Sequence, residues 1–402
     1  MTTPTESAPG ARVAALDGLR GVTIVLVVLG HAGNLVWPTD TLDRIPVVRS
    51  FVHGGAVGIF FVVGGYIVTR GLLREYDRGT FDAVRFYLRR LVRLGVQVVP
   101  LAAAVLLVHA VDETDVASTR ATLGSAVNVV THTSNLHATT DLLSTRADLG
   151  HMWYLAVQQQ VYLVLPLAVL LLAGRRWVLA ALFVEGIVAS VLWRHHVLET
   201  SGWIEATVST LARADAVLAG ALVALVVEAA RRHRALAPAL LTVGGLALVA
   251  TMATLREIGE PYLYLRWWGV LFTAFTAVTV LGIALLDRPT PASRLLSLPP
   301  LTWLGRASLA IFVWHLPLFF FVQRHTTQWT WQPRAITTFA LLAGIVWLTH
   351  RFLDEPARVW LRHHLRPPSP SPVDTPLGTA PGGGPARGPQ LDEPATAAGG
   401  RS

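Results

Sequence analysis

Runs of apolar residues long enough to cross a lipid bilayer recur along the chain, and short polar stretches rich in arginine separate them. A spanning α-helix needs about 20 predominantly apolar residues. This pattern predicts ten helices, which cover residues 14–33, 53–70, 88–109, 152–173, 177–194, 207–229, 236–254, 266–286, 302–323 and 335–353. We therefore expect an all-α integral membrane protein in which about ten transmembrane helices form one bundle.

The two ends of the chain lack this pattern. Residues 1–11 are largely polar, and residues 367–402 are rich in proline and glycine with almost no large apolar side chain. Such segments cannot bury enough surface to offset the entropy lost on ordering. We expect disorder at residues 1–11 and 367–402, and a membrane domain over residues 12–366.

Composition and charge agree with a multi-pass protein of the inner or plasma membrane. The chain is 52% hydrophobic and 14% charged, and all 33 of its basic Lys and Arg positions are arginine. The arginines concentrate in loops that are cytoplasmic if the N-terminus is inside, so the positive-inside rule predicts N-in/C-in. We attribute the net charge of +8 to this topology. The expected partner is the lipid bilayer and not nucleic acid.

Several kinds of chemistry are excluded or disfavoured. The chain has no cysteine, which excludes a disulfide framework, a thiol nucleophile and thiolate metal ligands. Residues 111–150 form a Thr-rich polar stretch that contains His132 and His137 without a metal-ligand spacing, and we expect a solvated loop there. We predict no metal site and no tightly bound cofactor.

Arg20 and His31 lie on the same side of the first predicted helix, which is otherwise almost entirely apolar. Eleven residues at about 100° each bring the two side chains within about 20° of one direction, about 16 Å apart along the axis. An ionisable group in hydrocarbon costs about 2.5–3.5 kcal/mol on insertion scales. The pair therefore indicates a polar interior surface and a functional site.

The predicted topology sorts the polar residues of the spans into two layers. The inner layer consists of arginines alone: Arg20, Arg89, Arg90, Arg93 and Arg306. The outer layer is mixed: His31, His151, Gln158, Arg213, Asp215 and, near mid-depth, His315. Arginines bind phosphate through forked hydrogen bonds, and an imidazole suits removal of a proton from a hydroxyl. The layers thus suit an anionic cytosolic donor and a hydroxyl acceptor, although topology anchoring is the alternative for the arginines.

Seven stretches, in order, resemble the membrane acyltransferase-3 family, whose hallmark is an arginine, ten residues and a histidine. They lie at 16–33 (LDGLRG to HAG), 58–66 (GIFFVVGGY), 85–93 (RFYLRRLVR), 151–162 (HMWYLAVQQQVY), 213–220 (RADAVLAG), 304–315 (LGRASLAIFVWH) and 352–356 (FLDEP). The resemblance covers roughly residues 11–365. Members transfer acyl groups from cytosolic acyl-CoA to hydroxyls of surface polysaccharides, glycolipids or secreted small molecules.

The resemblance implies roles for individual residues. His31 is the expected catalytic base with Arg20 as its partner, and Arg90 with Arg93 is the family's pair near the donor. With Arg89, these arginines are expected to hold the phosphates of acyl-CoA, a co-substrate. The candidate substrate contacts are His151, Trp153, Gln158, Arg213, Asp215 and His315.

Some of these candidates have a second interpretation, and some depart from the family pattern. Arg213 and Asp215 are expected to neutralise each other, and His151 beside Trp153 is alternatively an interfacial anchor. The family usually has glutamate at the positions of Gln158 and, often, Gln159, and serine at that of Gly64. These departures affect acceptor specificity.

We therefore expect an integral membrane O-acyltransferase that moves an acyl group, acetyl first, from acyl-CoA to a hydroxyl. The acceptor is a carbohydrate or small molecule: a cell-surface sugar, a glycolipid or a secreted metabolite such as a macrolide-type antibiotic. Two alternatives are a transporter or exporter of a glycosidic or acidic small molecule, in which His31 relays protons, and a non-catalytic scaffold. The sequence does not indicate an oligomeric state.

Overall fold

The computed structural model describes residues 9–33, 35–38, 55–141, 145–257 and 264–365, with side chains described in these ranges except at 9–12 and 255–257. All of them belong to one compact unit, Met1–Pro367. We expected disorder at residues 1–11 and 367–402. Of these, residues 1–8 and 367–402 lie outside the described ranges. Residues 9–11 belong to the first helix.

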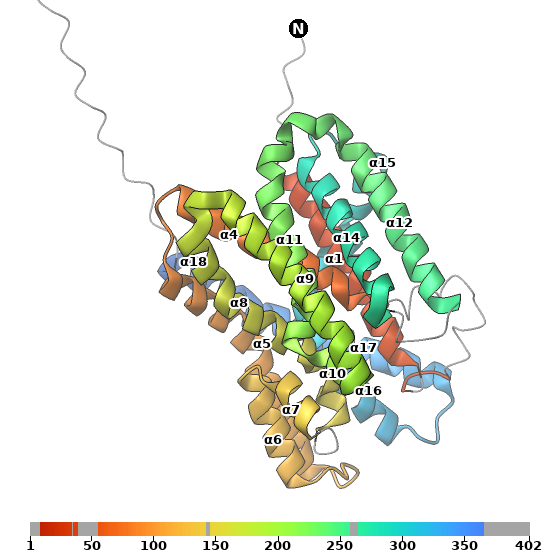
Figure 1. The fold of residues 1–402 in the computed structure, drawn as a ribbon. Coiled ribbons are helices and arrows are strands. Elements are labelled where there is room, and N and C mark those ends of the chain that lie inside the picture. The colour runs from red at the N-terminus through yellow and green to blue at the C-terminus, as the bar shows by residue number, and fades with distance from the viewer. Residues whose placement is uncertain (1–8, 34, 39–54, 142–144, 258–263, 366–402) are drawn as a thin grey trace, which may run out of the picture. The chain divides into compact units, whose positions relative to one another are not determined.

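Each of the ten predicted membrane helices corresponds to a long α-helix (Figure 1). These are α1 (Pro9–Ala32), α4 (Val57–Asp77), α5 (Ala83–Val111), α8 (Trp153–Leu172), α9 (Arg176–Thr200), α11 (Thr210–Ala230), α12 (Ala237–Glu257), α14 (Gly269–Leu285), α16 (Pro299–His325) and α17 (Trp331–Thr349). Within the described ranges, 8 helical stretches are long and apolar enough to cross a membrane. Two of them, Ala147–Thr200 and Trp203–Thr254, each contain two of the long helices, so the all-helical, multi-pass prediction is confirmed.

Shorter helices connect or extend the long ones. The α-helices are α6 (Thr119–Val130), α7 (Ser134–Thr140), α10 (Trp203–Val208), α15 (Pro291–Leu296) and α18 (Glu355–His364). The 3-10 segments are η2 (Ala147–Met152), η3 (Ala173–Arg175) and η4 (Arg231–Leu236), and the π segments are η5 (Tyr264–Trp268) and η6 (His350–Asp354).

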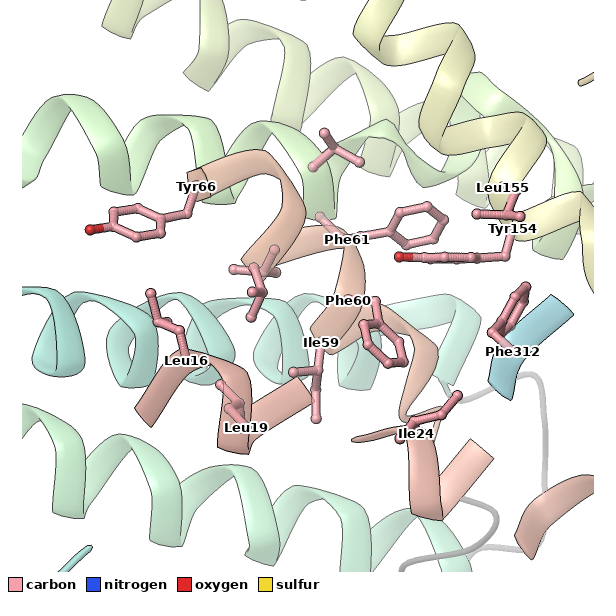
Figure 2. Packing of buried hydrophobic residues seen from close by; sticks show 14 of the residues in the cluster. Leu16, Leu19, Ile24, Ile59, Phe60, Phe61, Tyr66, Tyr154, Leu155 and Phe312 are labelled. Carbon is pink, nitrogen blue, oxygen red and sulfur yellow. The ribbon is translucent and has the colours of Figure 1, made fainter. Parts of the chain in front are cut away.

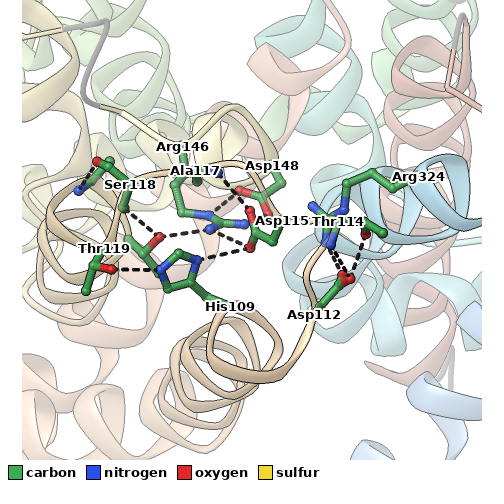
Figure 3. A network of polar contacts seen from close by, with 12 residues as sticks. His109, Asp112, Thr114, Asp115, Ala117, Ser118, Thr119, Arg146, Asp148 and Arg324 are labelled. Atoms are coloured by element: carbon green, nitrogen blue, oxygen red, sulfur yellow. Dashed lines mark hydrogen bonds and ion pairs between the residues drawn. The ribbon is translucent and has the colours of Figure 1, made fainter.

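The expectation of a solvated loop over residues 111–150 is wrong, because α6, α7 and the start of η2 lie there. Arg146 is buried in this segment and binds two carboxylates (Figure 3). Its guanidinium donates to Asp115 at 2.9 Å, to Asp148 at 2.6 and 2.9 Å and to the Thr122 hydroxyl at 2.9 Å. The two carboxylates offset the cost of burying this cation and hold residues 112–148 in a folded segment, which we call the cap.

A second ion pair joins the end of α5 to the end of α16. The Arg324 guanidinium donates to the Asp112 carboxylate at 3.1 Å, and Thr114 donates to it through its backbone N–H at 3.0 Å and its hydroxyl at 2.6 Å (Figure 3). Burial by itself raises the pKa of Asp112, but these hydrogen bonds outweigh it and lower the pKa to about 2. The carboxylate therefore stays ionised at neutral pH.

Glycines allow α1 and α16 to pack with their backbones in close approach. A Cβ at Gly21 would lie 2.0 Å from the Leu301 carbonyl oxygen, and one at Gly305 would lie 1.8 Å from that of Asp17. The same device joins α4 to α11, where a Cβ at Gly65 would lie 2.0 Å from a backbone oxygen. Small residues at helix interfaces are typical of membrane bundles. The α1–α16 contact is the one that brings the polar residues of the two helices together.

Candidate functional site

A cavity of about 570 Å³ lies among α1, α4, α5, α8 and α16. Its polar lining contains four arginines, two carboxylates and three further polar groups of α8, in addition to Ser308: Arg20, Arg89, Arg90, Arg93, Asp17, Glu75, Tyr154, Gln158 and Tyr162. Four of the five arginines predicted for the inner layer therefore share one cavity with a formal net charge of +2. Arg306, predicted for the same layer, is exposed and is not part of the lining.

Two of the cavity arginines are paired with acids. Arg89 donates to the Glu75 carboxylate at 2.7 Å, and Arg20 lies 3.3 Å from the Asp17 carboxylate. Arg20 also donates to the Ser308 hydroxyl of α16 at 2.8 Å. The formal charge of these two arginines is thus largely balanced within the protein.

The formal charge of the other two arginines is not balanced by a carboxylate. Arg90 donates from Nε to the amide oxygen of Gln159 at 2.8 Å, and its guanidinium lies 3.8 Å from the centre of the Tyr162 ring. Both partners are neutral. Arg93 lines the cavity with an exposed side chain and makes no hydrogen bond or ion pair within the described part of the chain. Arg90 and Arg93 are therefore the cations best able to bind an added anion.

Gln158 lines the cavity, and its predicted position in the outer layer is wrong. Because α8 begins at Trp153, Gln158 lies five residues further, which is about 7.5 Å along the helix axis from the start of the helix. A Cβ at Gly64 would lie 2.7 Å from the Gln158 amide nitrogen and 2.4 Å from the Tyr162 hydroxyl. The two departures from the family pattern at Gly64 and Gln158 thus face each other in the cationic cavity.

Three of the predicted site residues, His31, His151 and His315, form one cluster beyond the cavity. The ring centroids of His31 and His315 lie 5.1 Å apart, and those of His151 and His315 lie 4.9 Å apart. His151 and His315 are buried and His31 is half-buried. His151 is therefore part of a packed histidine cluster and not an interfacial anchor.

Hydrogen-bond partners define the protonation pattern of two of these histidines. Nδ1 of His31 lies 2.9 Å from the Val27 carbonyl oxygen, and Nδ1 of His315 lies 2.7 Å from that of Phe312. A carbonyl only accepts, so each Nδ1 carries the hydrogen. Nε2 of His315 then accepts from His31 Nδ1 at 3.2 Å. This arrangement holds the His31 ring and leaves its Nε2 with a lone pair.

Aromatic side chains lie between the cavity and the histidine cluster, and Figure 2 shows three of them, Phe61, Tyr154 and Phe312. Phe312 lines the cavity, and its ring lies 5.0 Å from that of His151 and 5.8 Å from that of His315. Tyr154 packs against Phe312 at 5.3 Å and against Phe61 at 4.4 Å. Arg20 and His31, which both contact α16, thus lie on opposite sides of this aromatic partition.

The predicted mutual pairing of Arg213 and Asp215 is wrong. Side chains two residues apart on a helix point in different directions, and Asp215 instead forms an ion pair with Arg194 at 2.9 Å. Arg213 donates to the Tyr264 hydroxyl at 3.2 Å and lies 6.0 Å from the Trp153 ring centre. Arg194 and Tyr264 are additions that the sequence pattern did not indicate, because each contact joins segments far apart in the chain.

These features define a polytopic membrane protein with a cationic cavity on one side of an aromatic partition and an oriented imidazole on the other. The chain matches the family model described as an acyltransferase domain over residues 13–350, and it belongs to the acyltransferase 3 family. The expected resemblance is thereby confirmed.

Curated relatives are distant. The chain is 25% identical over 358 residues to the O-acetyltransferase OatA of Staphylococcus aureus, which covers 85% of this chain and 57% of that protein. It is 27% identical over 373 residues to the peptidoglycan O-acetyltransferase OatA of Listeria monocytogenes (86% and 56%) and 27% identical over 334 residues to the putative peptidoglycan O-acetyltransferase YrhL of Bacillus subtilis (76% and 48%). The chain thus spans about half the length of the curated relatives it matches. No solved structure matches it.

Proposed function

We propose that the protein is a membrane O-acyltransferase that moves an acyl group, acetyl first, from acyl-CoA to an acceptor hydroxyl. The observation that carries this proposal is the His31 imidazole, whose Nδ1–H is held by Val27 and His315 while Nε2 keeps its lone pair. A neutral, oriented imidazole is the group that general-base removal of a hydroxyl proton requires. Membership of the acyltransferase 3 family and the cationic cavity support the same reaction.

The cavity suits the donor. Its volume of about 570 Å³ lies within the range of roughly 300–1,000 Å³ typical of ligand pockets. Arg93 and Arg90 are the arginines without an acidic partner, so they bind the CoA phosphates, whereas Arg89 is already paired with Glu75. With the N-terminus in the cytoplasm, as the arginine distribution predicts, the cavity opens towards the cytosolic donor.

The chemical step is a direct transfer. Nε2 of His31 takes the hydroxyl proton, and the oxygen forms a bond to the thioester carbonyl carbon. The C–S bond then breaks, and the CoA sulfur leaves and recovers the proton from the imidazolium. Arg20, which shares the cavity with Arg90 and Arg93, binds the donor on the cavity side of the aromatic partition. Phe312 and Tyr154 line the cavity next to the histidines, so we expect the thioester to pass these two side chains on its way to His31.

The first acceptor to test is a cell-wall sugar hydroxyl, because two of the relatives carry peptidoglycan in their names. Membranes containing the full chain are incubated with radiolabelled acetyl-CoA and glycan fragments. We expect His31→Gln to abolish transfer while the protein remains inserted. His196→Gln, on the exposed side of α9, is the matched control and retains activity.

Full transfer by the His31→Gln variant contradicts the proposed base. Acceptor uptake into sealed vesicles without any acetylated product favours the transporter instead, in which the same imidazole relays protons.

A further inference from the structure

Arg213 is a buried cation without an acidic partner of its own. Its side chain is 4% exposed, and within the described residues its only hydrogen bond goes to the neutral Tyr264 hydroxyl at 3.2 Å. The neighbouring carboxylate, Asp215, is bound by Arg194 at 2.9 Å, and both of these residues are also buried. Two guanidinium groups and one carboxylate leave this cluster with a formal charge of +1 inside the helical bundle.

One edge of the Arg213 guanidinium has unused hydrogen-bonding capacity. Nε has no hydrogen-bond partner, and Nη2 on the same edge binds only the Tyr264 hydroxyl. A carboxylate binds arginine side-on through these two nitrogens, one oxygen to each. The Tyr264 oxygen occupies the position that one of these carboxylate oxygens would take.

Aromatic rings surround this guanidinium on several sides. The centres of the Tyr264, Phe61 and Trp153 rings lie 5.1, 5.9 and 6.0 Å from its central carbon. Ring faces attract a cation, but they do not neutralise it. Trp153 and Tyr264 are only half-buried, so the walls of this aromatic cage reach the surface.

The cage lies beside the histidine cluster. Trp153 begins α8 two residues after His151, and the Phe61 ring lies 6.2 Å from Trp153 and 4.4 Å from Tyr154 of the aromatic partition. A ligand whose carboxylate binds Arg213 would lie next to Trp153 and so near the histidine cluster that contains the proposed base, His31.

We propose that Arg213, with Tyr264 and Trp153, is the binding site for a carboxylate group of the acceptor, so that the enzyme prefers acidic hydroxyl compounds such as uronic-acid sugars. The proposal rests on the acyltransferase function proposed above. A single carboxylate matches the cluster's charge of +1, whereas a phosphate dianion exceeds it. The bound carboxylate forms an ion pair with Arg213. Asp215 does not form this pair, because Arg194 binds its carboxylate.

The test compares two acceptors that differ only at C6. The full chain in nanodiscs is assayed with acetyl-CoA and either methyl glucuronide or methyl glucoside. We expect the wild type to prefer the glucuronide. Arg213→Gln raises the KM for the glucuronide about tenfold or more, the effect of losing a hydrogen-bonded charge pair, and leaves the KM for the glucoside nearly unchanged. Arg213→Lys is intermediate, since lysine keeps the charge without the fork.

Arg266→Gln is the matched control. Arg266 is exposed and lies two residues after Tyr264, so this variant removes one positive charge near the cage without touching it. We expect both KM values to stay unchanged. Equal effects of Arg213→Gln on the two acceptors, or no effect in a folded variant, overturn the proposal. A stronger preference for methyl glucoside 6-phosphate than for the glucuronide also overturns it.

A binding measurement separates this proposal from the proposed reaction. Titration of the wild type with glucuronate is followed by tryptophan fluorescence, and Trp153→Phe identifies the signal from the cage. A saturable signal that Arg213→Gln abolishes supports the carboxylate site even if no acetyl transfer is detected. Absence of that signal in an enzyme that transfers acetyl in a His31-dependent manner refutes the site and leaves the function intact.

Discussion

An alanine at Gly21 should disturb the reaction without touching any reacting group. A Cβ there would lie 2.0 Å from the Leu301 carbonyl oxygen, and real Cβ contacts are essentially never shorter than 3.0 Å. Helices α1 and α16 must therefore separate by about 1 Å, and such overpacking costs about 1–3 kcal/mol of stability. The same displacement lengthens the 3.2 Å contact between His31 and His315 to about 4 Å, beyond hydrogen-bonding distance.

The expected loss of activity follows from that hydrogen bond. A typical intramolecular hydrogen bond contributes about 0.5–1.5 kcal/mol, so kcat falls about 2- to 12-fold. Thermal unfolding and acetyl-transfer rates are measured on variants purified in the same detergent. Gly344→Ala in α17 is the control, because no heavy atom lies within 4 Å of its added Cβ. Equal melting temperature and kcat for the two variants would refute this link between helix packing and catalysis.

Two further outcomes test the arginine cavity and the cap. Arg93→Gln should raise the KM for acetyl-CoA more than Arg89→Gln, because Glu75 already balances Arg89; equal KM values for both variants would contradict this. The lowered pKa of Asp112 stabilises the fold fully above its ordinary value of 3.8, and this contribution is lost as pH falls towards about 2. The difference in melting temperature between the wild type and Asp112→Asn should therefore shrink as pH falls from about 5 towards 2. A difference that does not change over this range would exclude the ion pair with Arg324 as its source.

Hydropathy predicted the long helices well, because a bilayer demands about 20 apolar residues in each span regardless of the fold. Helix ends were less predictable. The structure extends α5 from 88–109 to Ala83–Val111, since a helix continues through polar residues when a cap such as Asp82 satisfies its first N–H groups.

The candidate site was predictable from the sequence where the depth of a residue in the membrane was enough to group it with others. Arg20, Arg90 and Arg93 were assigned to one layer, and they share one cavity. Depth did not reveal which groups would pair. The partnership of Asp215 with Arg194 depends on how α9 packs against α11, and a lone arginine at the end of an apolar run gives no sign of it.

The pairing of α1 with α16 has a consequence for how the protein is made. His31 and His315 are 284 residues apart, and Arg20 and Ser308 are 288 apart. At a synthesis rate of roughly 5–20 residues per second, α1 remains in the membrane for on the order of 15–60 s before the ribosome has made α16. Throughout that interval Arg20, His31 and the glycine face of the helix lack their partners from α16. A nascent chain that stops before α16 can therefore insert most of the bundle and still lack the oriented imidazole.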